Sequence, residues 1–205
     1  MTGPGGSVHQ PQRRVVGEDW SLDDLTGREE TLVEYVRVDM AETTSDGGLV
    51  FDTCTFRDIG FDLAQHTSAA FGNCSFISCR FTNTRLRDCK FVGSSFERCE
   101  FTRTTVEGGD WSFVSLRGAD LHTAAFADVR MRETDLTGID ARGGTLRGCD
   151  TTSAIWQNAF LERCDLRGTD LRTLDPWHVQ LAGARITWEQ AIIVALGLGL
   201  DVSPE

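Results

Sequence analysis

Two residue types in this sequence could carry chemistry, histidine and cysteine, and their spacing argues against a reactive site. The four histidines stand at positions 9, 66, 122 and 178, and no two have the spacing of a metal-binding or catalytic pair. A zinc site needs ligands that converge on one point, whereas the seven cysteines are spread from position 54 to position 164. No Gly-rich phosphate loop, nucleophile elbow or paired-carboxylate site is visible. We therefore expect no catalytic residue, no cofactor-binding residue and no metal site.

The cysteines instead reveal a repeat, because all of them are separated by multiples of five residues. They are Cys54, Cys74, Cys79, Cys89, Cys99, Cys149 and Cys164, and other small or medium residues occupy the remaining positions of this register. Two residues after each such position lies a large apolar residue. This second register runs from Phe51 to Ile186 without a slip, and only His66, Thr151 and Pro176 are not apolar. The period of five is the main structural signal of the chain.

Two inward registers separated by two residues predict short extended segments, since alternate residues of a strand share a face. Such short strands can bury both registers only if the chain bends after each pentad and stacks coil upon coil. Cysteine and alanine fit the smaller register because a large central side chain leaves little room beside it. We therefore interpret the cysteines as buried core thiols. His66, in the large register, is interpreted as a hydrogen-bonded histidine in a distorted coil.

Several segments have the consensus of a known family, among them Ala119-Asp120-Leu121, Cys164-Asp165-Leu166-Arg167-Gly168 and Thr169-Asp170-Leu171-Arg172. On these segments the chain resembles the pentapeptide-repeat family over residues 51–186. The resemblance implies an all-β fold, a right-handed, quadrilateral parallel β-helix with four pentads to each coil.

Four segments are expected along the chain. Residues 1–17, rich in Gly, Pro and Gln, are predicted to be a disordered tail. Residues 18–50 are predicted to be an irregular acidic N-terminal segment or first coil, out of phase with the main repeat by one residue, and the stretch 45–48 absorbs the shift as a loop. The β-helix follows over 51–186, and residues 187–205 form a C-terminal capping and dimerisation helix.

The C-terminal helix has a sequence signature at its start. Thr187-Trp188-Glu189-Gln190 has the form of a capping box, and Gly197 is a natural stop. The helix would cover the last coil, whose open edge would otherwise invite strand addition. Its apolar residues also predict a homodimer interface, formed by Trp188, Ala191, Ile192, Ala195 and Leu196.

The charge is strongly acidic, with a formal net charge of −11 and an isoelectric point near 4.8. Direct nucleic-acid binding is therefore not expected, because it depends on clustered Lys and Arg. No apolar run is long enough to span a bilayer and no signal peptide is visible, so we expect a cytoplasmic protein without a membrane partner. Eight aspartates immediately precede a central position of the repeat: Asp110, Asp120, Asp135, Asp140, Asp150, Asp165, Asp170 and Asp175. They form either a solubilising surface of Asp–Arg pairs or an acidic binding surface.

Within the family, the chain is similar to the topoisomerase-protecting branch, which includes mycobacterial and plasmid-borne quinolone-resistance proteins. The similarity lies in the Gln65-His66 break of the phenylalanine ladder and in the ending from Leu181 to Ala191. It implies a dimeric DNA mimic that binds DNA gyrase, with topoisomerase IV as a second target, through the eight aspartates, and that inhibits the enzyme or protects it from poisons. The alternative is a non-enzymatic interaction scaffold with another partner. An enzyme ranks third.

Overall fold

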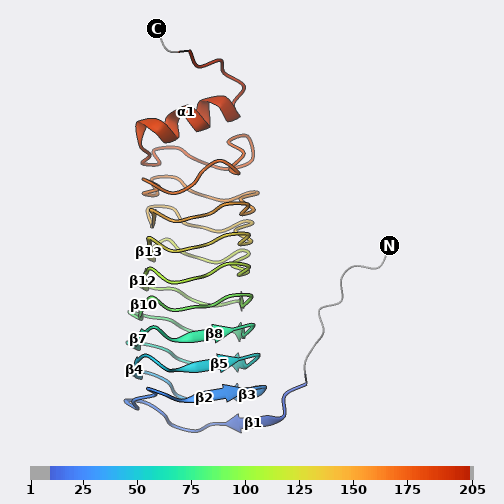
Figure 1. Ribbon diagram of the computed structural model, residues 1–205, viewed down its shortest axis with the longest axis vertical. Helices are drawn as coiled ribbons and strands as arrows, with labels where there is room; N and C mark the ends of the chain where they lie inside the picture. The colour runs from blue at the N-terminus through green and yellow to red at the C-terminus, as the bar shows by residue number, and fades with distance from the viewer. Residues whose placement is uncertain (1–9, 204–205) are drawn as a thin grey trace, which may run out of the picture.

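The computed structural model describes residues 10–203, which form a parallel β-solenoid with one helix at its C-terminal end (Figure 1). Most strands are only three residues long. They are β1 (Arg13–Val16), β2 (Glu29–Thr31), β3 (Val33–Val36), β4 (Thr44–Asp46), β5 (Val50–Asp52), β6 (Thr55–Arg57), β7 (Gln65–Thr67), β8 (Ala70–Gly72), β9 (Ser75–Ile77), β10 (Arg85–Arg87), β11 (Ser95–Glu97), β12 (Thr105–Glu107), β13 (Ala125–Ala127) and β14 (Thr145–Arg147). The helix α1 spans Trp188–Gly197.

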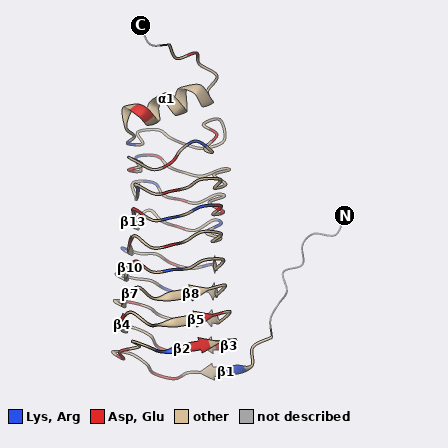
Figure 2. Cartoon of the chain, viewed as in Figure 1, with Lys and Arg blue, Asp and Glu red and all other residues tan. Residues whose placement is uncertain are grey.

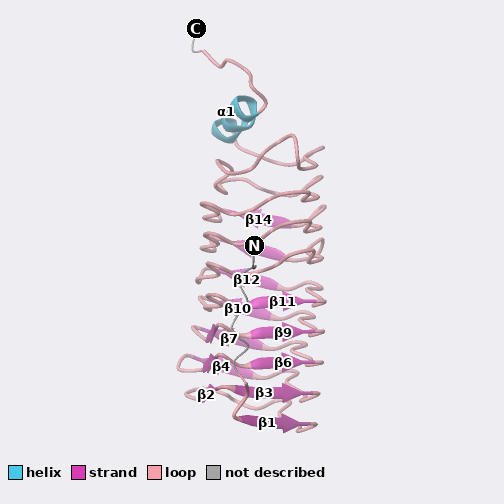
Figure 3. Ribbon diagram, turned by 90° about the vertical axis from the view of Figure 1, so that its right-hand side faces the viewer, coloured by secondary structure: helices cyan, strands magenta, loops and turns pink. Residues whose placement is uncertain are grey.

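The strands stack into parallel sheets that run along the rod (Figure 3). One sheet has the order β1-β3-β6-β9-β11, a second the order β4-β7-β10-β12-β13-β14 and a third the order β2-β5-β8. A fourth side is held by isolated parallel bridges, such as those joining Arg80 to Glu100 and Glu100 to Asp120. Strand partners lie four pentads apart along most of the chain, as in the pair Arg85↔Thr105, so four pentads make one coil. The predicted four-sided parallel solenoid is confirmed.

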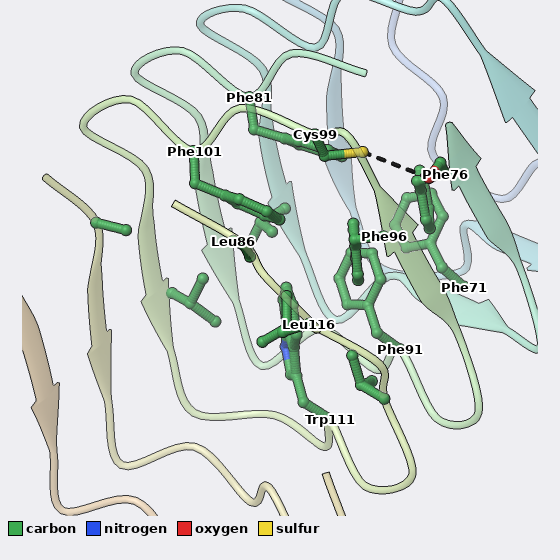
Figure 4. Packing of buried hydrophobic residues seen from close by; sticks show 14 of the residues in the cluster. Phe71, Phe76, Phe81, Leu86, Phe91, Phe96, Cys99, Phe101, Trp111 and Leu116 are labelled. Carbon is green, nitrogen blue, oxygen red and sulfur yellow. Dashed lines mark hydrogen bonds between the residues drawn. The ribbon is translucent and has the colours of Figure 1, made fainter. Parts of the chain in front are cut away.

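The core consists of the two inward registers. Stacked coils are about 4.8 Å apart, which is close to the distance at which aromatic rings stack. Phe56 and Phe76 have ring centroids 4.8 Å apart, and Phe76 and Phe96 have centroids 4.7 Å apart, with nearly parallel planes. The smaller register fills the space beside these columns, as where the Cys99 thiol donates to the carbonyl oxygen of Phe76 at 3.4 Å (Figure 4).

The insertion of one residue at the predicted loop is confirmed by the strand register. Asp24 pairs with Thr44, exactly four pentads later along the chain, whereas Glu29 pairs with Val50 instead of Leu49. The additional residue therefore lies between Thr44 and Val50. Gly47 and Gly48 have φ values of +86° and +69°, a left-handed conformation that glycine adopts without steric cost.

The N-terminal part of the chain differs from the prediction. Residues 13–17 are not a disordered tail, because β1 pairs with β3 in the register Arg13↔Val33. Residues 18–50 are coils of the same rod, which is the second of the two predicted alternatives, and not an irregular segment. The physical reason is that Val15 already occupies the inward register and is buried, while Arg13 pairs with Glu30. The prediction was wrong for residues 13–17 because their composition was judged together with that of the Gly- and Pro-rich start of the chain. The part of the tail prediction that concerns residues 1–9 lies outside the described residues.

Helix α1 starts as predicted and ends two residues later than predicted. Thr187 and Gln190 form the capping box. Gly197 is still helical, Leu198 is the C-cap, and Gly199, with a φ of +81°, supplies the left-handed stop. No helix within residues 10–203 is long and apolar enough to cross a membrane.

Candidate functional site

The eight predicted aspartates share one local geometry. The side chain of each accepts a hydrogen bond from the backbone N–H two residues later, at 2.9–3.3 Å. Aspartate favours such turns because its short side chain can bond its own backbone. These residues therefore stabilise the bend of each pentad, whatever else they bind. Asparagine would keep the acceptor and remove the charge.

The solenoid distributes the eight aspartates over all four of its sides. Asp110, Asp150 and Asp170 lie on the side that begins with β2, β5 and β8. Asp120 and Asp140 are bridged to each other on the side without named strands. Asp135 lies on the β1 side, where it is bridged to Ile155, and Asp175 lines a cavity together with Ile155. Asp165 lies on the side of β14, to which it is bridged. The structure therefore does not bring all eight together on one face, although Thr152 does join two of them, because its hydroxyl oxygen lies 2.7 Å from Asp150 and 3.1 Å from Asp170.

The side chain of an arginine or a histidine lies beside each aspartate. Six are paired with arginine: Asp110–Arg130, Asp135–Arg117, Asp140–Arg142, Asp150–Arg132, Asp165–Arg167 and Asp170–Arg172, with N···O distances of 2.5–3.4 Å. Asp120 and Asp175 contact His122 and His178. The hydrogen bond from Arg167 lowers the pKa of Asp165 to about 2, and that from Arg172 lowers the pKa of Asp170 to about 2. Six of the eight carboxylates are therefore locally compensated by an arginine.

A second group of acids was not among the predicted binding residues. The sequence 18–46 contains ten acids and only Arg28 and Arg37, and the structure makes it part of the rod (Figure 2). Bridges place Asp19 beside Asp39. In the same column, after Gly60 and Arg80, they place Glu100 beside Asp120 and Asp120 beside Asp140. We name Asp19, Asp39, Glu100, Asp120 and Asp140 the acidic column. Among the residues that the structure describes, Asp19, Asp39 and Glu100 form no ion pair.

The sequence did contain a signal for the acidic column. Glu100 precedes a central phenylalanine in the same register as the eight aspartates. Asp19 and Asp39 enter that register once the residue inserted near Gly48 is allowed for. The acidic column could have been predicted from the sequence if glutamates had been considered together with aspartates and the one-residue insertion near Gly48 had been applied.

The C-terminal helix presents two faces. Toward the rod, the buried Gln190 amide donates to the carbonyl oxygens of Leu166 and Thr169, both at 2.7 Å, and Ile193 and Val194 pack on the core. The other face carries the predicted interface residues. Trp188 is 73% exposed, Leu196 is 55% exposed and Ile192 is 36% exposed, while Ala191 is exposed and Ala195 is half-buried. The helix thus caps the last coil with one face and leaves an apolar face uncovered.

Comparison with protein families identifies the repeat. A family model described as "Pentapeptide repeat region" matches residues 49–126, and one described as "Pentapeptide repeats (8 copies)" matches residues 146–173, together more than half of the chain. The chain belongs to the pentapeptide-repeat family. A search of curated protein sequences found no match.

Solved structures share the fold of this pentapeptide-repeat protein. A trypsin-treated variant of QnrB1, described as a plasmid-mediated fluoroquinolone resistance protein, is similar with a TM-score of 0.59 and 21% identity. The similarity covers 94% of this chain and 98% of that one. A second trypsin-treated QnrB1 variant gives a TM-score of 0.55 and 20% identity, with coverage of 95% and 99%. At these identities the similarity concerns the fold.

The buried histidine and the cysteines of this pentapeptide-repeat rod are core residues. His66 is buried, with Nδ1 2.9 Å from the hydroxyl oxygen of Ser45 and Nε2 3.4 Å from that of Thr43, as the hydrogen-bonded interpretation predicted. All seven cysteines are buried and free. Burial raises the pKa of Cys89 and Cys149 to about 11 and that of Cys164 to about 12. Within residues 10–203, no group of three or more His, Cys, Asp or Glu side chains could hold a metal ion.

We predict that most of the thiols will react with a water-soluble disulfide reagent only after unfolding. A thiolate is the reactive form, and burial disfavours it while excluding the reagent. The measurement is a thiol titration in native buffer and in denaturant. Seven thiols should react in denaturant and at most two in native buffer. Rapid native reaction of three or more would contradict the inward register.

Proposed function

We propose that this protein is a non-enzymatic DNA mimic that binds bacterial DNA gyrase, and topoisomerase IV as a second target, and protects the enzyme from poisons such as fluoroquinolones. The proposal rests chiefly on the acidic column, whose five carboxylates lie along one side of a continuous rod, in every coil from Asp19 to Asp140 except those of Gly60 and Arg80, and on the net charge of −11. A DNA duplex presents about one negative charge per 1.7 Å of axis, and a basic DNA-binding surface responds to such a linear array. Its site of action would be the cytoplasm, and it would not bind nucleic acid itself.

Rigidity supports this role. Backbone hydrogen bonds join successive coils on every side, and the aromatic columns fill the interior. A rod that is already ordered loses little conformational entropy on binding. The resemblance to the quinolone-resistance branch and the fold shared with QnrB1 support the choice of gyrase among basic DNA-binding partners.

We further propose that two copies join through the exposed face of α1, formed by Trp188, Ala191, Ile192, Ala195 and Leu196. An uncovered apolar face of this kind is unusual on a monomer. Because the face lies at the end of the rod, pairing two copies would double the length of the acidic surface.

The dimer proposal predicts that Ile192→Arg combined with Leu196→Arg yields a monomer at micromolar concentration. Two arginines on each copy would face each other across a two-fold interface. Light scattering should give the mass of a dimer for the parent and of a monomer for the variant. Leu22→Arg, which changes a 72% exposed leucine at the other end of the rod, should stay dimeric. A monomeric parent would contradict the proposal.

The gyrase proposal predicts that replacing Asp150, Asp165 and Asp170 by asparagine lowers inhibition of gyrase supercoiling at least several-fold. Asparagine keeps the turn hydrogen bond while three negative charges are lost. Replacing Asp39, Glu100 and Asp120 of the acidic column by the corresponding amides should lower inhibition as well, since two of these carboxylates have no ion pair among the described residues. Inhibition by the parent should weaken with rising salt.

A charge-matched control distinguishes the loss of a particular binding surface from a general effect of net charge on inhibition. Asp58→Asn, Asp88→Asn and Glu97→Gln also remove three charges, but from other positions within residues 51–103. This control should reduce inhibition less than either set above. Absence of inhibition by the parent would refute the gyrase proposal. Equal inhibition by the parent and all three variants would refute the DNA-mimic mechanism.

A second candidate function is a protein-interaction scaffold with a partner other than a topoisomerase. The ion pairing of six of the eight aspartates favours it, because paired charges make a solubilising surface as well as a binding one. A pull-down from a bacterial lysate that recovers a defined protein without gyrase subunits would favour this candidate.

A further inference from the structure

An apolar surface lies on the side of the rod near its C-terminal end. The position before each central residue points outward, and in residues 14–185 it is polar or small except at Val50, Ile155 and Phe160. Ile155 is 52% exposed, and Phe160 is partly exposed one pentad later, on the adjacent side. Trp177, in the next coil, is 71% exposed. We name Ile155, Phe160, Trp177 and Val179 the apolar corner.

The stacking of coils is interrupted beneath Trp177. Bridges join Ser95, Ser115, Asp135 and Ile155 in succession, but none joins Ile155 to Asp175. The Thr173 hydroxyl instead donates to the carbonyl oxygen of Ala154 at 3.1 Å.

The backbone register also shifts at this point. In the coil below, the backbone N–H of Gly138 donates to the carbonyl oxygen of Gln157, and the same step from Asn158 would reach Trp177. The N–H of Asn158 donates to His178 instead. The shift is confined to the segment that carries the exposed Trp177, because Phe160 is bridged to Gln180 at the usual step of 20 residues.

Two hollows flank the displaced segment. A cavity of about 330 Å³ is lined by Ile155, Trp156 and Gln157 of one coil and by Thr173, Asp175, His178 and Val179 of the next. A second cavity, of about 400 Å³, is lined by Phe160 and Ala159 below and by Trp177, His178, Val179 and Gln180 above. No residue of α1 lines either cavity, so the apolar corner is distinct from the proposed dimer face. Each cavity is large enough to receive one side chain of a partner.

Acidic groups border the apolar corner. The Asp175 side chain is 54% exposed, and Glu162, two residues after Phe160, forms no ion pair with any described residue. One of its carboxylate oxygens, Oε2, also has no hydrogen-bond partner. An exposed aromatic side chain beside two hollows and near acids matches a protein surface that presents an apolar side chain between lysines or arginines.

We propose that the apolar corner is the anchor by which the protein holds its partner, a basic DNA-binding protein surface with a protruding apolar side chain. The inference rests on the function proposed above. Carboxylates along the rod accelerate the encounter, because complementary charge acts mainly on the association rate. The apolar corner slows dissociation, because desolvated aromatic anchors hold most of the binding energy of an interface.

The test measures the kinetics of binding to immobilised DNA gyrase for the full-length protein and its variants. Trp177→Ala and Ile155→Ser should each raise the dissociation rate about tenfold and leave the association rate within twofold. Both are expected to fold, because Trp177 is largely exposed and serine already occupies the position of Ile155 in the coils of Ser95 and Ser115. The control is Phe113→Ala, an aromatic residue 55% exposed at another corner, whose kinetics should match the parent.

The outcomes separate the inference from the function on which it rests. If the parent does not bind gyrase, the proposed function fails and the anchor fails with it. If the parent binds and both corner variants dissociate at the parental rate, the anchor alone is wrong. Loss of the dimer by light scattering in Trp177→Ala would also overturn it, because the corner would then be a contact between copies.

Discussion

Gly109→Ala is expected to lower the free energy of unfolding by about 3 kcal/mol or more. A Cβ at this position would lie 2.1 Å from the carbonyl oxygen of Cys89 and 2.8 Å from its nitrogen, both atoms of the backbone of the coil below. Backbone atoms held in a stacked coil cannot move aside as a flexible side chain could. The φ of +84° adds a steric cost for any residue with a Cβ.

Gly118→Ala is the control that separates the cost of the steric clash with the neighbouring coil from the cost of the backbone conformation. Gly118 also has a positive φ, +67°, but a Cβ there would meet nothing within 4 Å. Its substitution should therefore cost about 1 kcal/mol, the conformational term alone. Urea unfolding followed by circular dichroism gives both values. If the two variants have the same midpoint, the approach of the coils at Gly109 is looser than described.

The second large effect is a loss of stability in mild acid caused by His66. Burial lowers the pKa of His66 to about 4, whereas the unfolded chain has the ordinary value of about 6.5. Between these values the unfolded state binds a proton that the folded state does not, so stability is greatest above pH 6.5 and falls as the pH drops toward 4. The shift corresponds to about 3 kcal/mol. Below pH 4 the folded state also takes up the proton and this contribution stops changing.

His66→Phe tests this assignment, since phenylalanine occupies the equivalent inward register in Phe126 on the same side of the rod. The variant should be less stable at neutral pH, because the Ser45 hydroxyl loses its hydrogen bond to the imidazole, while the Thr43 hydroxyl keeps only its bond to the carbonyl oxygen of Met40. Its stability between pH 6.5 and 4 should nevertheless fall by about 3 kcal/mol less than that of the parent. Denaturant unfolding at several pH values measures the difference. Parallel curves for parent and variant would show that another group causes the loss.

Local patterns in the sequence were sufficient to predict the inward registers, the buried cysteines, the insertion near Gly48 and the capping box of α1. Each depends on residues a few positions apart, whose preferences for a strand face, a left-handed turn or a helix start are local. The prediction of a disordered tail over residues 13–17 was wrong because it, too, used only local sequence patterns. The pairing of Arg13 with Glu30 and of β1 with β3 joins residues of successive coils, which composition does not register.

Which charged side chains become neighbours on the surface was determined by the tertiary structure. A period of five specifies which side chains point outward, but the number of pentads in one turn determines which of them become neighbours. With four pentads per turn, Glu100, Asp120 and Asp140 fall in one column, and the eight aspartates are divided among four sides. The arginine that pairs with a carboxylate can lie in the same pentad, as for Asp140, or in a neighbouring coil, as for Asp135 and Asp110. The interruption of stacking below Trp177 is also determined by the tertiary structure, because a missing bridge between two coils can be recognised only when the coils are in contact.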